Sequence, residues 1–477
     1  MERRAVIIGA GLGGLLCGEM LSRNGFKVFV AEKQARPGGC LQTFRRAGMT
    51  FDCGFHYVGG MRPGEALGKI FDAFSLRDLP FVRMDPGCSD EVTIGNDTFS
   101  IPSDGPDAFV DVLSGSFPAQ RDNLERYASL LKQVWDNIFG ALSSQAMNPL
   151  FATGAKAWLE ETISDPLLRK VLSANALKME LSPSLPLYTF AQINSSFMMS
   201  SWRLTGGGDS IVSALCDSIR ACGGEIILGD AASRIVSDGA KVTSVELASG
   251  ESIPCDVAVA DTHPAVAMAL AENTEGVRKI YRRRISSLES TFGMFTVNAA
   301  LKKGALPYVN HNLFIHSAEA DMWNPASGKV DSVMVHFYPE GDHLDIMTPM
   351  DFAEVSGWAD TSTGRRPEEY AEFKRGKAEE CICLAGKRIP GLRDAIDRVW
   401  TSTPLTWRDY TGSVNGSAYG VRKDFSSPEQ TLIPSRTPLP GLFLTGQSLN
   451  LHGILGVGMT ALLTCREILG PDPVRIA

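Results

Sequence analysis

The spacing of apolar positions in the first forty residues predicts a strand, a helix and a second strand. The unbroken apolar run over residues 5–8 is typical of a buried parallel strand. Leucines then recur at helical spacing from Leu12 to Leu21, and Asn24-Gly25 offers a helix stop. Residues 26–31 repeat the pattern of a buried strand. This order predicts a βαβ unit.

Similar patterns predict the elements of the rest of the chain. Gly206 to Asp209 indicate a turn and a helix N-cap ahead of an amphipathic helix through Ile211, Leu215 and Ile219. A β-meander is expected over 241–247 and 252–260. Further strands are expected over 225–228, 293–299, 312–316, 332–337 and 441–447, and helices over 367–388 and 457–469. The chain is therefore expected to have an α/β fold.

Composition narrows the class of protein. The 477 residues are 44% hydrophobic and carry a formal net charge of −8, which is ordinary for a globular protein and gives no reason to expect nucleic acid as a partner. The ten cysteines form no CxxC pair, so no metal site is predicted and reduced thiols in the cytoplasm are expected. No apolar run reaches the ~18 residues of a membrane span. The basic run Arg282-Arg283-Arg284 fits a solvated helix face better than a lipid contact.

The glycines after the first strand point to a bound dinucleotide. Gly9 permits a tight turn, Gly11 lets the backbone approach a pyrophosphate, and Gly14 lets helix and strand pack closely. The helix N-terminus that follows favours an anion. Glu32 ends the second strand, where a carboxylate would accept hydrogen bonds from ribose hydroxyls.

Two distant segments complete the requirements for a flavin. Gly38-Gly39 offers backbone without Cβ atoms beside the ribityl or pyrophosphate oxygens. Thr445-Gly446-Gln447 ends the last strand, and Gly453 to Gly458 introduce a helix whose N–H groups can face the flavin O2. The predicted cofactor is therefore FAD.

These motifs resemble the FAD-dependent superfamily of phytoene desaturases, carotenoid isomerases and retinol saturases. The resemblance covers nearly the whole chain, through the glycine fingerprint, Asp52 to His56, the Gly206 turn, the segment from Thr403 to Gly420 and the closing strand. It implies a three-layer, Rossmann-type FAD-binding domain, discontinuous over 1–75, 196–290 and 431–477. A mixed-sheet substrate domain with a helical cap would take 76–195 and 291–430. The implied FAD contacts are Gly9, Gly11, Leu12, Gly14, Glu32, Lys33, Gly38, Gly39, Ala232, Gly446, Gln447, Gly456 and Val457.

The resemblance also implies an apolar substrate with conjugated double bonds, such as a carotenoid, a retinoid or another isoprenoid lipid. The reaction would be saturation, desaturation or isomerisation, with hydride transfer at flavin N5 and a protein group handling a proton. His56, Tyr419 and His452 are the candidates for that group. The electron donor or acceptor is left open.

Several alternatives stay open. An amine oxidase-like flavoenzyme would need an aromatic cage at the flavin, where this chain has Leu449, Leu451 and His452. A non-catalytic, membrane-associated scaffold would keep the flavin for structure only. Residues 181–199 would form either an apolar lip for peripheral contact with a membrane or, as ordinary packing favours, part of the core.

Overall fold

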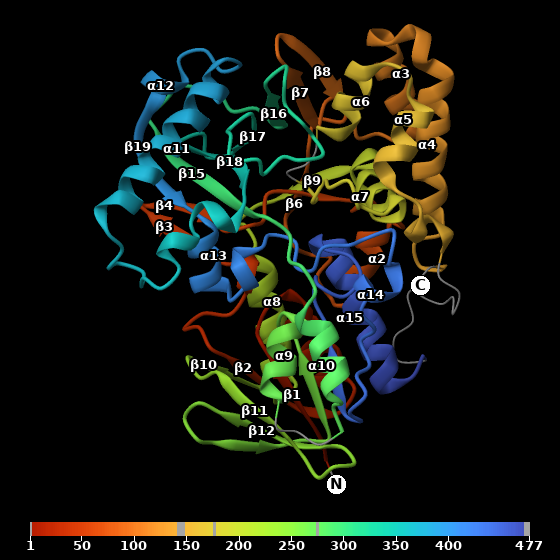
Figure 1. The fold of residues 1–477 in the computed structure, drawn as a ribbon, viewed down its shortest axis with the longest axis vertical. Helices are drawn as coiled ribbons and strands as arrows, with labels where there is room; N and C mark the ends of the chain where they lie inside the picture. Colours follow the sequence, from red (N-terminus) through yellow and green to blue (C-terminus); the bar gives the residue numbers. More distant parts are fainter. Residues whose placement is uncertain (1, 141–147, 175–177, 273–275, 472–477) are drawn as a thin grey trace.

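Five parallel strands form the lower sheet in Figure 1, in the order β10-β2-β1-β14-β20. The computed structural model describes residues 2–140, 148–174, 178–272 and 276–471. The strands of the lower sheet are β1 (Arg3–Ile8), β2 (Phe26–Glu32), β10 (Glu225–Leu228), β14 (Val257–Ala260) and β20 (Leu442–Leu444). The first and last strands of the described chain are thus separated only by β14.

The alternation of apolar side chains places one layer on each face of this sheet. Ile7 and Val28 pack with the helices, whereas Val6, Ile8 and Phe29 pack against the β-meander. The helices are α1 (Leu12–Arg23), α8 (Asp209–Ala221) and α15 (Gly453–Leu469). The meander is β11 (Ala232–Ser237), β12 (Val242–Leu247) and β13 (Ser252–Pro254). This arrangement confirms the predicted three-layer, Rossmann-type fold.

A mixed sheet of seven strands forms the upper part of the molecule (Figure 1). Its order is β19-β15-β18-β17-β16-β7-β8, and only the pair of β16 and β7 is parallel. Its strands are β7 (Asp90–Ile94), β8 (Asp97–Ile101), β15 (Gly293–Leu301), β16 (Asn312–His316), β17 (Ser332–Phe337), β18 (His343–Met350) and β19 (Ile396–Ser402).

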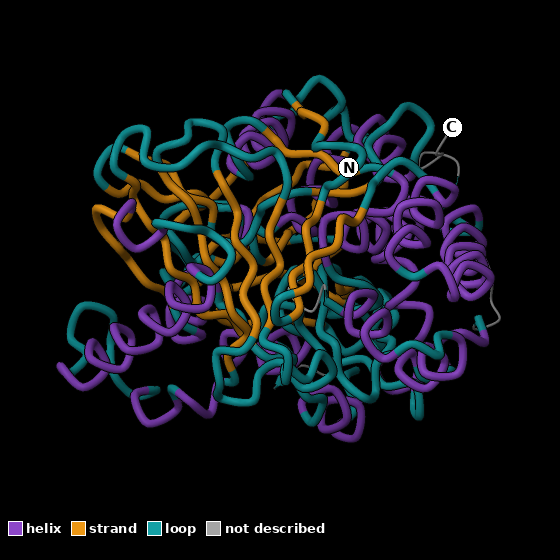
Figure 2. Tube along the Cα trace, turned by 90° about the horizontal axis from the view of Figure 1, so that it is seen from above, coloured by secondary structure: helices purple, strands orange, loops and turns teal. Residues whose placement is uncertain are grey.

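The two faces of the upper sheet pack against different helices, which Figure 2 shows from above. Val297 and Ile346 pack with α11 (Glu368–Gly386) and α12 (Leu392–Ala395). Met294, Met334 and Met347 belong to the opposite face and pack in one core with the helical cap. The cap consists of α3 (Pro106–Ser116), α4 (Arg121–Asp136), α5 (Ala155–Thr162), α6 (Pro166–Ser173) and α7 (Leu187–Met199).

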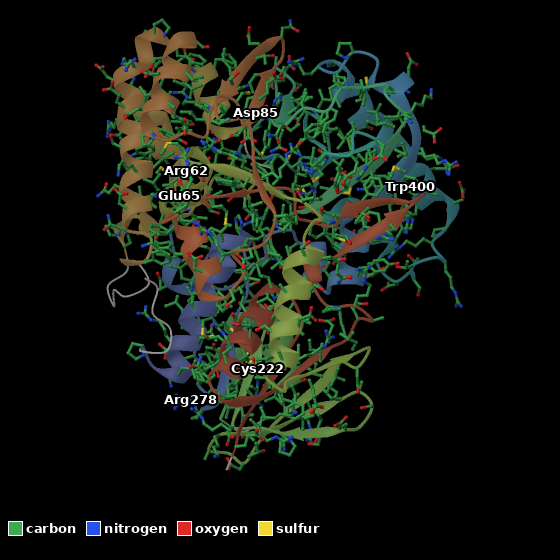
Figure 3. All side chains as sticks on the ribbon, turned by 180° about the vertical axis from the view of Figure 1, so that it is seen from behind. Arg62, Glu65, Asp85, Cys222, Arg278 and Trp400 are labelled. Atoms are coloured by element: carbon green, nitrogen blue, oxygen red, sulfur yellow. The ribbon has the colours of Figure 1, made fainter. Side chains whose placement is uncertain are left out.

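Short elements join the two halves. A small sheet of β5 (Val58–Gly59), β9 (Ser201–Leu204) and β6 (Phe81–Arg83) lies between them. Figure 3 shows Arg62 and Glu65 together at the base of the cap, far from Trp400 on β19. The remaining elements are β3 (Thr43–Arg46), β4 (Met49–Asp52), α2 (Ala66–Ala73), α9 (Pro264–Leu270), α10 (Lys279–Ser286), α13 (Pro404–Thr411), α14 (Pro428–Thr431) and the 3-10 turns η1 (Gly39–Leu41), η2 (Pro118–Gln120), η4 (Pro149–Ala152), η5 (Phe352–Glu354), η6 (Ser356–Trp358) and η7 (Val414–Gly416).

One expectation needs correction, and two others can be made more specific. The expected strand over 252–260 is two strands, because β13 ends the meander and β14 joins the lower sheet. The N-cap of α8 is Gly208, within the predicted turn from Gly206 to Asp209, and the Asp209 carboxylate binds Arg36 and Thr43. The part of 181–199 that forms α7 is a largely buried helix, as the favoured alternative of core packing predicts. The domain boundaries 1–75, 196–290 and 431–477 stay a prediction.

Candidate active site

One cavity of about 460 Å³ connects the lower sheet to the upper one. Its lower walls follow the carboxyl ends of β1, β2, β14 and β20, at Gly9, Glu32, Asp261 and Gly446. Its upper walls are the methionines of the seven-stranded sheet and one face of α7. Ligands of doubly wound sheets bind outside the carboxyl ends of the strands, so the cavity lies where the fold expects a ligand.

The glycine loop after β1 is held around a carboxylate that the sequence analysis did not single out. A Cβ at Gly9, whose φ is +98°, would lie 2.7 Å from the carbonyl oxygen of Asp261. A Cβ at Gly11 would lie 2.5 Å from Asp261 Oδ2, and one at Gly446 would meet Oδ1. Because of these short distances, residues with a side chain have no room where the segments meet.

Burial raises the pKa of Asp261 to about 6, although the hydrogen bond from the Gly14 N–H opposes the shift.

The backbone at the start of α1 keeps donors for a ligand. Asp261 accepts the N–H of Gly14. The N–H groups of Gly11, Leu12 and Gly13 have no hydrogen-bond partner among the described residues. Unpaired N–H groups in the first turn of a helix are the donors that can bind a phosphate. This first turn lines the cavity.

Glu32 is nearly buried, and its carboxylate is fixed by backbone. Its Oε2 accepts from Ala10 N–H at 2.8 Å and its Oε1 from Gln34 N–H at 2.8 Å. Each oxygen keeps a lone pair, because a carboxylate accepts about four hydrogen bonds. A carboxylate held in this way at the cavity wall can accept the hydroxyls of a ribose.

The second glycine pair has the conformation that only glycine adopts easily. Gly38 has φ +119° and Gly39 has φ +55°, and a Cβ at Gly39 would reach to 3.4 Å from Gly11 Cα. Cys40 beside them lines the cavity, and burial raises the pKa of its thiol to about 11. The thiol stays protonated at neutral pH, in keeping with a packing role.

Nearly all predicted cofactor residues line the same cavity. They are Gly9, Gly11, Leu12, Glu32, Lys33, Gly38, Gly39, Ala232, Gly446, Gln447 and Val457. Two do not line it. Gly14 packs α1 against β1, because a Cβ there would meet Gly9 O and Ile7, and Gly456 packs against Leu451. These two glycines hold the walls in place from behind.

His56 lies in the cavity wall against the upper sheet. Its Nε2 is 3.8 Å from Asp345 Oδ2 and has no hydrogen-bond partner among the described residues. Burial, with the Arg203 charge, lowers its pKa to about 4, so the imidazole is neutral at pH 7. The loop before His56 is anchored by the Asp52 N–H, which donates to Tyr338 Oη at 2.8 Å.

Tyr419 and His452 form one pair of rings in the cavity, with centroids 4.5 Å apart. Burial lowers the pKa of His452 to about 3, and burial raises the pKa of Tyr419 above its usual value. Tyr419 therefore keeps its proton and His452 is neutral at pH 7. His452 Nε2 has no hydrogen-bond partner in the described part of the chain. The pair combines an O–H donor with a neutral imidazole.

Several residues of the cavity wall were not predicted from the sequence. Trp407 follows β19, and Lys178 and Gln192 come from the cap. Met294, Met334 and Met347 come from three strands that meet only in the folded sheet. The alternation of side chains along each strand predicts on which face of the sheet each methionine lies. The sequence near each methionine does not show which of the two faces lines a ligand cavity.

The described residues contain no group of three or more His, Cys, Asp or Glu side chains that could hold a metal ion. None of their helices is both long enough and apolar enough to cross a membrane.

Comparisons with known proteins agree with this geometry. A family model described as an NAD(P)-binding Rossmann-like domain matches residues 7–74. All-trans-retinol 13,14-reductase of Macaca fascicularis is 24% identical over 97% of this chain and 85% of its own length. Chloroplastic prolycopene isomerase 2 of an Oncidium hybrid cultivar is 23% identical over 98% of this chain and 84% of its own length.

A solved structure shows the same fold. The crystal structure of an oxidoreductase from Methanosarcina mazei superimposes with a TM-score of 0.68 at 18% identity, covering 96% of this chain and 99% of that one. These relatives support the expected oxidoreductase class. The predicted resemblance is thereby confirmed: over nearly its full length, the chain is similar to retinol reductases and prolycopene isomerases, and it has a Rossmann-type fold.

Proposed function

We propose that the chain is an FAD-dependent oxidoreductase that acts on carbon–carbon double bonds of an unsaturated, isoprenoid-type lipid. The observation that carries the proposal is the single cavity, which continues from the glycine loops of the lower sheet to the methionines and aromatic rings of the upper sheet. A nucleotide needs the first wall, and an apolar chain fits the second. The names of the relatives, a retinol reductase and a prolycopene isomerase, agree with this class of substrate.

The residues present fit FAD. Glycines leave the backbone bare where a Cβ would collide, the α1 N-terminus keeps three N–H donors, and Glu32 accepts at the ribose position. In the proposal Gly446, Gln447, Val457 and the first turn of α15 would hold the flavin end, and Ala232 the adenine end. Bound FAD would supply hydride transfer at its N5.

The chain itself would position the substrate and handle a proton. Met294, Met334 and Met347 are adaptable apolar groups that exclude water from an alkene. The shifted pKa values fix the protonation states: Tyr419 keeps the proton that it would donate, and His452 is a neutral imidazole with a nitrogen that would accept one. This division suits proton removal as well as proton delivery, so the proposal covers saturation, desaturation and isomerisation.

The test uses purified protein loaded with FAD. The flavin absorbance is titrated first, and the dithionite-reduced and oxidised forms are then incubated anaerobically with retinol and carotenoids. We expect saturable FAD binding and a changed polyene absorbance with at least one form. His452→Phe should retain FAD and lose most turnover. A folded protein that does not bind FAD would contradict the proposal. Full FAD occupancy without any change in the polyenes would favour the alternative of a non-catalytic scaffold.

A further inference from the structure

A lysine side chain is buried in the upper, apolar end of the cavity. The side chain of Lys178 is 6% exposed, and its ammonium lies 4.5 Å from the ring centre of Phe197 and 5.3 Å from those of Tyr57 and Phe314. Lys178, Tyr57 and Phe197 all line the cavity. An apolar hydrocarbon would gain nothing from a cation in this position, which therefore calls for another explanation.

The ion pair of Lys178 belongs to a larger buried network. Its ammonium pairs with Asp90, whose side chain is 2% exposed. Asp90 Oδ2 also accepts from Tyr57 Oη at 3.2 Å, and Asp90 Oδ1 accepts from Asn312 Nδ2 at 3.0 Å. Asn312 Oδ1 in turn accepts from Arg203 Nη2 at 3.2 Å. One carboxylate thus lies between two cations.

Arg203, the second cation of this network, donates its hydrogen bonds to neutral groups. Arg203 is 4% exposed, and its other partners are neutral: the carbonyl oxygens of Phe337 and His311 and the ring of His336. Burial lowers the pKa of His336 well below its usual value, so this ring adds no charge. Asp345, beside His336 in the sheet register, accepts from Tyr338 and Asn298. Asp345 is ionised at pH 7, because its pKa is raised only to about 6, and the Asp85 charge also acts on Arg203, so Arg203 does not depend on Asp90 alone. Lys178 forms its ion pair with Asp90, and it shares that carboxylate with the donors of Tyr57 and Asn312.

A second polar group opens into the same cavity. Gln192 on α7 is 1% exposed and lines the cavity, and its Oε1 has no hydrogen-bond partner among the described residues. A half-turn of the amide exchanges its oxygen and nitrogen, so the group can donate to a ligand as well as accept from it. The cavity wall thus offers a hydrogen bond in addition to a charge.

We propose that this end of the cavity binds a carboxylate, with Lys178 as its cation, so that the substrate is an unsaturated lipid acid rather than a hydrocarbon or an alcohol. The inference rests on the proposed function and names the head group of its substrate. The Lys178 ammonium has three donors and Asp90 takes one of them, so a substrate carboxylate would accept a hydrogen bond between two charged groups. A hydroxyl would accept the same donor without a charge, and its hydrogen bond would be weaker.

Three probes with one carbon skeleton test this on the FAD-loaded protein: all-trans-retinoic acid, its methyl ester and all-trans-retinol. Dissociation constants follow from the quenching of tryptophan fluorescence. We expect the acid to bind at least about tenfold more tightly than the other two, which corresponds to ~1.4 kcal/mol. Equal binding of all three would overturn the inference alone. Binding of none would contradict the proposed function as well.

Variants locate the effect. Lys178→Met leaves Arg203 and Asp90 to balance each other, so we expect it to fold, to keep FAD and to bind the acid about tenfold more weakly, with ester and alcohol changed less than about twofold. Lys178→Arg should retain most of the preference for the acid. Lys170→Met is the matched control, because Lys170 lies on α6 in the same cap, donates to the Ala318 carbonyl oxygen and does not line the cavity. Undiminished acid binding in folded Lys178→Met would refute the assignment.

Discussion

At the scale of single residues, the glycines of the cofactor wall differ from ordinary turn glycines in their surroundings. Gly446 has φ +95°, and a Cβ there would meet the Asp261 carboxylate. Gly250 has φ +92° and nothing within 4 Å of the added atom. A residue with a Cβ would therefore have the same backbone strain at both positions, and the two positions differ only in the space available for that Cβ.

This difference yields a prediction. Gly250→Ala should cost only the left-handed backbone strain, ~1–2 kcal/mol, and leave FAD affinity unchanged. Gly446→Ala adds a collision within the cavity wall, so we expect a larger drop in thermal stability and at least a hundredfold loss of FAD affinity. Calorimetry and titration of flavin fluorescence measure the two effects. Similar FAD affinities in both variants would show that crowding at Asp261 is unimportant.

A buried carboxyl gives a pH dependence with a definite sign. Burial raises the pKa of Asp52 to about 8, while its Oδ1 accepts from Gly208 N–H at 2.8 Å. Between pH 4 and 8 the folded chain holds a proton on Asp52 that the unfolded chain has lost. Stability therefore falls as pH rises through this window, by at most ~1.4 kcal/mol per pH unit for one group.

Asp52→Asn keeps the acceptor and removes the titration. Because the other buried groups titrate in both proteins, we expect the urea midpoint of the wild type to fall relative to that of the variant as pH rises from 5 to 8. Asp238→Asn is the control, since hydrogen bonds from the backbone lower the pKa of this exposed carboxyl and its effect is confined to more acidic pH. A slope in Asp52→Asn as steep as in the wild type would contradict the assignment.

At the scale of elements, one lysine joins the segment before α14 to the loop after β20. Lys423 Nζ is buried and donates to the carbonyl oxygens of Thr431 at 2.8 Å, Ser448 at 2.7 Å and Leu449 at 3.0 Å. The loop that it binds continues from Gln447 to His452, which line the cavity. The conformation of this part of the cavity wall thus depends on a side chain outside it.

Lys423→Met should leave these carbonyl groups without their donor. An unsatisfied buried acceptor costs ~1–3 kcal/mol, so we expect a loss of about 3 kcal/mol or more in unfolding free energy and weaker FAD binding. Lys303→Met, at an exposed position, should change neither. Both are measured by urea unfolding followed with circular dichroism. Unchanged stability of Lys423→Met would show that packing, and not the Lys423 hydrogen bonds, holds the loop after β20 in place.

The same scale shows what sequence reasoning could reach. The βαβ unit, the strands β10, β16 and β17 and the glycine loops were predictable, because each depends on neighbours in sequence or on the backbone freedom of glycine. Lys178 and Asp261 were not. Their roles arise where a cap segment meets β7 and where β14 meets the glycine loop, and such long-range contacts leave no local pattern.

At the scale of the whole molecule, the cavity couples the two sheets, because both contribute to its walls. FAD that binds only the folded chain should raise stability by ~2.7 kcal/mol at a hundredfold excess over its dissociation constant. We expect one thermal transition, and FAD should raise its midpoint equally whether unfolding is followed by circular dichroism or by tryptophan fluorescence. A shift in only one of these signals would show that the lower sheet unfolds independently of the upper one.

The lower sheet is assembled from both ends of the chain, which matters during synthesis. β1 and β2 leave the ribosome first, but β14 pairs with β20 only after residues 442–444 have been made. Until then the edge of β14 carries unpaired backbone groups, the state in which strands join the wrong neighbours. A nascent chain stalled or cleaved short of its last thirty-odd residues would expose this edge, so premature termination should yield aggregates rather than a smaller working flavoprotein.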